Sequence, residues 1–308
     1  MSNIVFFGTP AFAVPALQAL ADSSYRPVAV VTAPDKPQGR KRILTPSPVA
    51  LEAERLGIQV LKPSTLKDDA FWGQFEALGA SLCVVVAYGK LIPERLLTSV
   101  PKGWLNIHPS LLPAYRGPSP IPSAILDGQT TTGVSIMLLD TEQDHGPVLA
   151  TSPWNIPGTA TTPECEVEIA RVGAQLLLST LPAYLNGSCS PVAQDDSKAT
   201  FTKKFTREDG RIDWSQSAHA IVNRIRALGT NPGTWTTWEG KTLNIFRAHA
   251  QDRDAAAPGG VHRDGDALIV ACGAGSLVLE RVQLEGSTQQ DIATFLRGHP
   301  SLADGMLV

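Results

Sequence analysis

The 308-residue sequence has only four cysteines, and they are widely separated. No pair has the C-x-x-C spacing of a zinc or redox motif, so a disulfide framework and structural zinc are both disfavoured. Few, scattered cysteines fit a protein of a reducing compartment. Cys83 lies in a strongly apolar run, which predicts a small buried hydrophobic side chain.

The sequence also lacks membrane and export signals. No uncharged apolar stretch reaches the roughly 20 residues that a membrane span needs. The short apolar run Ile4–Gly8 has no basic region before it, so it predicts a first strand and not a signal peptide. We therefore expect a soluble, cytoplasmic protein. No coiled-coil repeat or apolar arm is evident, so a monomer is expected.

An excess of positive charge is missing too. The formal net charge is −3, and the residues from Phe201 onward hold equal numbers of cationic and anionic side chains. A generally basic surface is therefore excluded. Any contact with nucleic acid must come from a local cluster of cations.

What is present, through the first half of the chain, is an alternation of strand-like and helix-like segments. Helices are expected at Pro48–Leu56, with Ser47 as N-cap, at Asp68–Leu78, and at Pro163–Leu185 after a capping box. The strand-like runs are Ile4–Phe7, Pro27–Thr32, Ile58–Leu61, Leu82–Ala87, Trp104–Ile107 and Gly133–Leu139. The pattern predicts an α/β fold with a doubly wound, mainly parallel, Rossmann-like sheet. Ligands bind such sheets beyond the carboxyl ends of the strands.

Composition changes after residue 187, where turn-forming residues lose all periodicity. We expect a first domain over residues 1–187, a linker over 188–206 and a second domain over 207–308. The second domain opens with an amphipathic helix, Ser215–Leu228, and continues with short strand-like runs. These runs predict a smaller β-barrel that is OB-like.

The densest cluster of chemically useful side chains follows the strand expected at Trp104–Ile107. Asn106 and His108 are two residues apart, so their side chains leave the strand on the same face. An amide can donate to the oxyanion of acyl transfer, and an imidazole can donate likewise or move a proton. The alternative is that these side chains only satisfy loop backbone at the strand end.

A second cluster follows the strand expected at Gly133–Leu139. Asp144 could approach His108, and a carboxylate there would orient the ring and favour its protonated form. From sequence alone Asp140 is an equally good candidate, and Asp144 could simply form a turn before Gly146. A metal site from His108, Asp144 and His145 is conceivable, although three ligands on two loops are weak evidence for one.

A third feature is the one dense basic cluster in the chain, formed by Lys36, Arg40, Lys41 and Arg42. These cations lie in a stretch rich in proline and glycine, 32–48, which we interpret as a mobile loop able to bind phosphates. An ordinary solvated surface loop is the alternative. The turn Phe7-Gly-Thr-Pro10 lacks the glycines of a dinucleotide motif, so a nicotinamide-dependent oxidoreductase is disfavoured.

Together these stretches resemble the methionyl-tRNA formyltransferase family over nearly the whole chain. The segments that carry the resemblance are Phe7–Pro10, Pro34–Arg40 with Pro46–Pro48, Ala87–Pro93, Asn106–Gly117 and Asp144–Gly146. The Asn-x-His and Asp set alone would identify only the wider folate-dependent formyltransferase fold. The basic loop and the second domain point to the tRNA-specific branch.

The resemblance implies a formyl donor, 10-formyltetrahydrofolate, and an acceptor, the α-amine of initiator methionyl-tRNA in translation initiation. It implies no metal. The residues that it implies are catalytic Asn106, His108 and Asp144; folate-binding Ala87, Tyr88, Gly89, Leu91, Ser110, Leu111, Leu112 and Pro113; and tRNA-binding Lys36, Arg40, Lys41 and Arg42.

Two residues depart from the family pattern: Pro109 stands where glycine is usual, and His145 where a small residue such as threonine is common. Proline there removes an N–H and fixes φ. Several rival functions stay open: a formyltransferase acting on an amino sugar-nucleotide, a deformylase that gives the formyl group to water, and a non-catalytic RNA-binding protein on the same scaffold.

Overall fold

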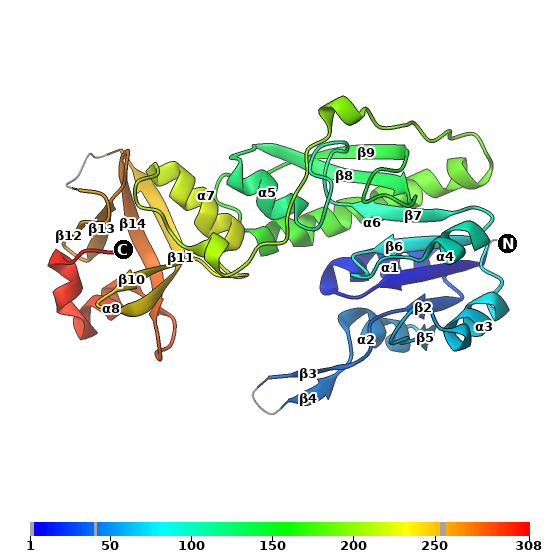
Figure 1. The fold of residues 1–308 in the computed structure, drawn as a ribbon, viewed down its shortest axis with the longest axis horizontal. Helices are drawn as coiled ribbons and strands as arrows, with labels where there is room; N and C mark the ends of the chain where they lie inside the picture. Colours follow the sequence, from blue (N-terminus) through cyan, green and yellow to red (C-terminus); the bar gives the residue numbers. More distant parts are fainter. Residues whose placement is uncertain (1–2, 40–41, 253–256) are drawn as a thin grey trace. The chain divides into compact units, whose positions relative to one another are not determined.

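The computed structural model describes residues 3–39, 42–252 and 257–308 (Figure 1). Its chain forms two compact units. The first consists of Met1–Gly117, Thr131–Asn155 and Glu166–Phe201, and the second of Pro118–Thr130, Ile156–Cys165 and Thr202–Val308. Segment 188–201, the greater part of the expected linker, groups with the first unit.

The first unit is built on a seven-stranded sheet in the order β5-β2-β1-β6-β7-β8-β9. The first five strands of this order run parallel to one another, and β8 and β9 each pair antiparallel with the strand before them. The predicted mainly parallel sheet is therefore confirmed. Strand β9 was not predicted. The bounds are β1 Ile4–Gly8, β2 Ala29–Val31, β5 Gln59–Leu61, β6 Leu82–Val86, β7 Trp104–His108, β8 Thr131–Leu138 and β9 Val148–Asn155.

Helices connect and cover these strands. The predicted N-cap Ser47 accepts a hydrogen bond from the Ala50 N–H at 3.0 Å, and the Glu164 carboxylate accepts one from the Thr161 N–H at 2.8 Å, which confirms both helix starts. The helices are α1 Val14–Ala21, α2 Pro48–Arg55, α3 Asp69–Ala77, α4 Glu94–Ser99 and α6 Thr162–Leu185. Sequence periodicity missed α1 and α4.

The two sheet faces have different partners. On one face, the rings of Phe7, Phe75 and Trp104 form an aromatic core beneath α3 and α4, with Phe7 and Trp104 centroids 4.8 Å apart. On the other face α6 packs so closely that a Cβ on Gly173 would lie 2.7 Å from Ile107. Because Asn106 and His108 alternate with Ile107, they lie on the same face as the aromatic core.

The basic stretch contains a two-stranded hairpin, β3 Lys36–Gln38 with β4 Ile43–Thr45, where a loop was expected. The expectation of a loop was wrong because proline and cations hid the strand pairing. In Figure 1 the two strands project away from the seven-stranded sheet. Lys36 and Arg42 are exposed, whereas Arg40 and Lys41 lie outside the described residues.

The second unit holds a six-stranded antiparallel sheet that curls as a half-barrel, in agreement with the predicted β-barrel-like fold class. Helix α7 packs against it through the predicted apolar face, where Ala218, Ile221, Ile225 and Leu228 are buried. The other elements are α5 Pro120–Leu126, α7 Ala218–Leu228, β10 Trp235–Trp238, β11 Lys241–Gln251, β12 Val261–Asp264, β13 Ala267–Ala271, β14 Ser276–Leu284, β15 Gln290–Asp291 and α8 Ile292–Gly298. Among the described residues, no helix has both the length and the apolar character to span a membrane.

Candidate active site

The neighbouring parallel strands β1, β6 and β7 end at one edge of the first unit's sheet. The chain order reverses here, with β2 on one side of β1 and β6 on the other, which is where α/β sheets bind ligands. The Thr9 hydroxyl donates to the Tyr88 carbonyl at 3.1 Å and ties the ends of β1 and β6 together. Asn106 and His108 are the polar residues of β7 at this edge.

His108 is 4 % exposed, and both of its ring nitrogens face acceptors. Nε2 lies 3.0 Å from the Tyr115 carbonyl oxygen, and Nδ1 lies 3.5 Å from Asp144 Oδ1. A neutral imidazole has a single N–H, whereas the imidazolium has two. Because a carbonyl oxygen only accepts, the Tyr115 contact places a proton on Nε2.

The side chain of Asn106 is partly exposed. Within the part of the chain that the structure describes, its amide has no hydrogen-bond partner. The amide is thus available to donate to a ligand placed beside His108.

Asp144 is held in an unusual conformation by several contacts. Its φ is +51°, its Oδ2 accepts a hydrogen bond from the Gly117 N–H at 2.8 Å, and its own carbonyl accepts one from Gln194 Nε2 at 2.9 Å. A Cβ on Gly146 would lie 1.9 Å from the Leu138 carbonyl oxygen, so this return of the chain needs glycine. Left-handed backbone also occurs at Ala87 (+46°) and Tyr115 (+59°), and such strain in non-glycine residues gathers at functional sites.

The structure shows which of the two candidate carboxylates, Asp140 or Asp144, lies beside His108. Asp144 approaches His108, whereas Asp140 Oδ2 lies 2.6 Å from His145 Nδ1. Over residues 3–39, 42–252 and 257–308, no group of three or more His, Cys, Asp or Glu side chains is suited to hold a metal ion.

The expected folate loop follows β6. The Tyr88 ring is buried against Phe7, with centroids 5.3 Å apart, and burial raises the pKa of its hydroxyl to about 12. The Tyr88 side chain is therefore enclosed in the core and closed to a ligand. Leu91 is the reverse case, because its side chain is 85 % exposed.

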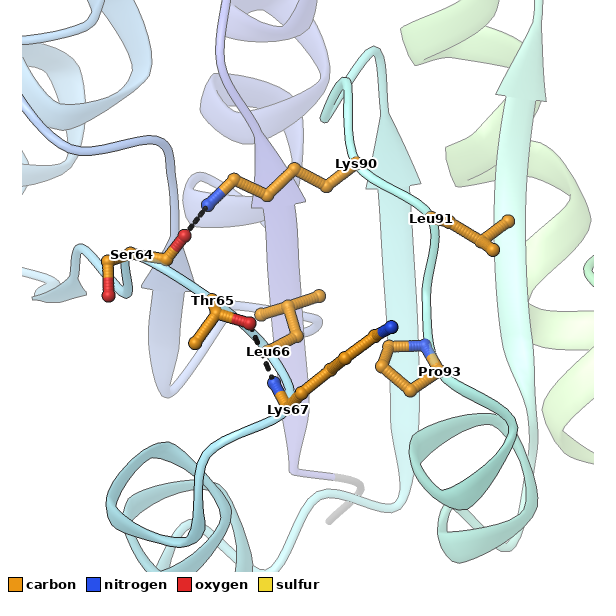
Figure 2. Close-up of a pocket in the computed structure, with 7 residues that line it drawn as sticks. All are labelled: Ser64, Thr65, Leu66, Lys67, Lys90, Leu91 and Pro93. Carbon is orange, nitrogen blue, oxygen red and sulfur yellow. Dashed lines mark hydrogen bonds between the residues drawn. The ribbon is translucent and has the colours of Figure 1, made fainter.

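Leu91 lines a pocket of about 230 Å³, shown in Figure 2. Lys90 also lines the pocket and fixes one side of it, since its ammonium donates to the carbonyls of Pro63 at 3.0 Å and Ser64 at 2.8 Å. The other lining residues are Ser64, Thr65, Leu66, Lys67 and Pro93. An apolar side chain exposed at the edge of a pocket is a candidate contact for a ring system.

The residues Ser110, Leu111, Leu112 and Pro113 shape the loop after β7. Ser135 Oγ donates to the Ser110 carbonyl at 2.7 Å and accepts from the Leu112 N–H at 3.0 Å. Leu111 covers Gly133, where a Cβ would lie 2.6 Å from its side chain. These contacts fix the loop and leave its ligand contacts as a prediction.

Three groups that sequence reasoning did not assign belong to this site: the Tyr115 carbonyl, the Gly117 N–H and the Gln194 amide. Backbone groups leave no sequence signal, although Gly117 falls within a motif of the resemblance. Gln194 lies among turn formers without periodicity, so nothing distinguished it.

The second unit carries a cluster of cations around an aromatic ring that was also missed. The guanidinium groups of Arg207 and Arg211 lie 5.5 Å and 5.6 Å from the Trp235 ring centroid. Both arginines are exposed, and Trp235 is partly exposed. Stacked cations and aromatic rings are typical of RNA-binding surfaces.

Comparison with known proteins identifies the chain. The formyl transferase family model matches residues 2–181, and the formyl transferase C-terminal domain model matches residues 204–300. The chain belongs to the formyl transferase family. It is 46 % identical over 299 residues to a methionyl-tRNA formyltransferase of Roseiflexus castenholzii, covering 96 % of each chain, so it belongs to the methionyl-tRNA formyltransferase branch.

Solved structures agree with the fold of this formyltransferase. The N-formyltransferase from Helicobacter canadensis, in complex with folinic acid and dTDP-3-aminofucose, has a TM-score of 0.70 at 15 % identity and covers 91 % of this chain and 99 % of its own. Methionyl-tRNA formyltransferase from Clostridium thermocellum has a TM-score of 0.57 at 18 % identity and covers 82 % of this chain and 94 % of its own. At such low identity these likenesses bear on the fold alone.

Proposed function

We propose that this protein transfers the formyl group of 10-formyltetrahydrofolate to the α-amine of methionyl-tRNA. The observation that carries the proposal is the 46 % identity to a methionyl-tRNA formyltransferase over nearly the full length of both chains. The imidazole–carboxylate contact of His108 and Asp144 beside the Asn106 amide supports it. Because this reaction serves translation initiation, the proposal implies a cytoplasmic enzyme, and we propose that it acts as a monomer.

In the proposed mechanism the neutral amine attacks the formyl carbon and forms a new C–N bond. The Asn106 amide donates to the oxyanion, and the charged His108 ring adds a positive field beside it. Asp144 receives the proton that the amine loses. When the tetrahedral intermediate collapses, the bond from carbon to N10 of the folate breaks, and N10 takes the proton that Asp144 received, which restores the carboxylate.

We propose that the charged β3–β4 hairpin binds the tRNA backbone through Lys36, Arg40, Lys41 and Arg42. The cluster of Arg207 and Arg211 around Trp235 supports a second contact with RNA from the C-terminal unit. Local cations of this kind suffice for phosphate contacts even though the whole chain is acidic.

Incubation of the protein with 10-formyltetrahydrofolate and methionyl-tRNA is the direct test, and we expect N-formylmethionyl-tRNA. Release of formate at the same rate without an acceptor would indicate a deformylase instead. Faster formylation of a dTDP-amino sugar than of methionyl-tRNA would favour the amino-sugar alternative.

Leu91→Ala is expected to raise KM for the folate about tenfold, because the folate ring system would lose its contact with an apolar side chain at the pocket edge. Steady-state kinetics with saturating methionyl-tRNA would measure the change. Thermal stability should be unaffected, since the Leu91 side chain is 85 % exposed.

Leu51→Ala is the matched control, because Leu51 is also exposed, at 52 %, but lies on α2 away from the pocket residues. An unchanged folate KM in Leu91→Ala would remove Leu91 from the proposed folate site.

A further inference from the structure

Asp144 lies within a closed ring of contacts that joins three separate segments of the first unit. Gln194 Nε2 donates to the carbonyls of Asp144 at 2.9 Å and Gly146 at 2.8 Å. Its Oε1 accepts a hydrogen bond from Arg116 Nε at 3.0 Å. Gly117, next to Arg116, donates to the Asp144 carboxylate, so the ring begins and ends at Asp144.

Arg116 is a buried member of this ring of contacts. Its side chain is 4 % exposed, and it donates to Asp196 Oδ1 at 2.7 Å. A buried guanidinium without partners is strongly unfavourable, so it holds Gln194 and Asp196 in place. The segment from Gln194 onward also holds Tyr115, because Thr200 Oγ1 accepts a hydrogen bond from the Tyr115 N–H at 2.8 Å.

His145 adds ion pairs beside this ring of contacts. Nδ1 lies 2.6 Å from Asp140 Oδ2, and Nε2 lies 3.6 Å from Asp196 Oδ2. The hydrogen bond to Asp140 raises the pKa of His145, and Asp140, Glu142 and Asp196 all add electrostatic attraction. The Arg116 guanidinium lowers the pKa of Asp196, which keeps that partner ionised.

We propose that Gln194, Arg116 and His145 form a clamp that positions Asp144 against His108, and that the charge on His145 tightens it. None of the three needs to touch substrate, so each is a positioning residue. The inference rests on the proposed formyl transfer for its activity assays. It gives a role to the stretch 194–201, which composition alone marks as connecting chain, and to His145, which departs from the family pattern.

Gln194→Glu tests the clamp, because glutamate keeps the oxygen that accepts from Arg116 and loses both donors to the Asp144 and Gly146 carbonyls. We expect kcat to fall about tenfold through misplacement of Asp144, with both KM values within about twofold of wild type. The same exchange at Gln283, whose Nε2 donates to the Ser287 carbonyl in the second unit, is the matched control.

Changed KM values with an unchanged kcat would overturn this part of the proposal. A readout without turnover separates it from the proposed function: the NMR resonance of the Gly117 amide, which donates to Asp144, should move in Gln194→Glu and stay in place in Gln283→Glu. If wild type forms no N-formylmethionyl-tRNA, the proposed function fails, and the Gly117 resonance still decides the clamp.

The charge on His145 predicts a pH dependence of known sign. Below its raised pKa the charged ring is hydrogen-bonded to Asp140 and ion-paired with Asp196, and as the pH rises through that pKa the ring loses its charge and the attraction to Asp196 weakens. His145→Asn keeps a neutral donor in place of Nδ1. We expect the ratio of wild-type kcat to variant kcat to be about threefold near pH 6 and to approach unity near pH 9.

Taking the ratio of the two kcat values cancels any pH dependence that both enzymes share, such as that of the amine substrate. The matched control is His249→Asn, because His249 forms a similar pair with Glu280 at 2.7 Å in the second unit. A wild-type to His145→Asn ratio that is constant with pH, or that rises with pH, would overturn the role of the charge.

Discussion

Asp144→Asn is expected to lower kcat for formyl transfer about 10³-fold, with little change in either KM, because it removes the group that receives the amine proton. Asparagine retains an oxygen that can accept from the Gly117 N–H, where Asp144 Oδ2 now accepts at 2.8 Å, so the loop should keep its place. The fall in kcat would then reflect the loss of the carboxylate charge beside His108 Nδ1 and not a displaced loop. Single-turnover transfer of labelled formyl to methionyl-tRNA would measure it.

Asp69→Asn serves as the matched control, since Asp69 is a carboxylate on α3 with a 96 % exposed side chain. It should retain wild-type turnover. If Asp144→Asn instead retains kcat within about threefold, Asp144 has no part in proton transfer, and the mechanism must be rebuilt on His108 and Asn106 alone.

The buried strands were predictable because their physical signal is local. Strand β6 is a run of five fully enclosed apolar residues, Leu82–Val86, which periodicity detects without tertiary information. Strand β9 shows the opposite: its residues Val148–Asn155 are partly or fully exposed at the sheet edge, so no buried apolar run marks it. Hairpin β3–β4 was not predicted either, because its strands are largely exposed and lie in a stretch rich in proline and cations.

The sequence allowed the candidate side chains of the site to be proposed, but not their geometry. The spacing of Asn106 and His108 fixes their common face, but nothing in the sequence distinguishes Asp140 from Asp144. That choice depends on the left-handed backbone at Asp144 and on the long-range donor Gly117, 27 residues away along the chain. A backbone N–H or carbonyl is present in almost every residue, so the residue types in a sequence do not show which backbone groups bind Asp144. Only the structure shows it.

In the proposed mechanism, the clamp explains how a carboxylate on a strained turn is held in a fixed position beside His108. Left-handed backbone at a non-glycine residue has a cost on the order of 1–3 kcal/mol and persists where surroundings over-determine it. At Asp144 those surroundings are Gly117, Gln194 and the close packing of Gly146 on Leu138. Positioning and catalysis are therefore assigned to different residues, which come from three separate segments of the first unit.

Neutralising the basic hairpin, with Lys36, Arg40, Lys41 and Arg42 all replaced by glutamine, is expected to raise KM for methionyl-tRNA by about 10²-fold at moderate salt. Each cation that contacts a phosphate releases counterions, so binding falls steeply as salt rises. The slope of log KM against log salt should become shallower by about 3, in proportion to the number of contacts removed. KM for the folate should stay within about twofold, because the hairpin lies outside the residues that we propose for the folate.

This prediction tests which formyl acceptor the enzyme uses, and it also tests whether the hairpin is the RNA-binding surface. An enzyme that formylates an amino sugar-nucleotide needs no extended phosphate contact, so the four substitutions would leave its kinetics unchanged. Arg171→Gln is the control for a general loss of charge, since Arg171 is exposed on α6 and pairs only with Glu168 at 3.5 Å among the residues described. A tRNA KM and salt slope that match wild type in the hairpin variant would assign RNA binding to other cations, beginning with Arg207 and Arg211 around Trp235.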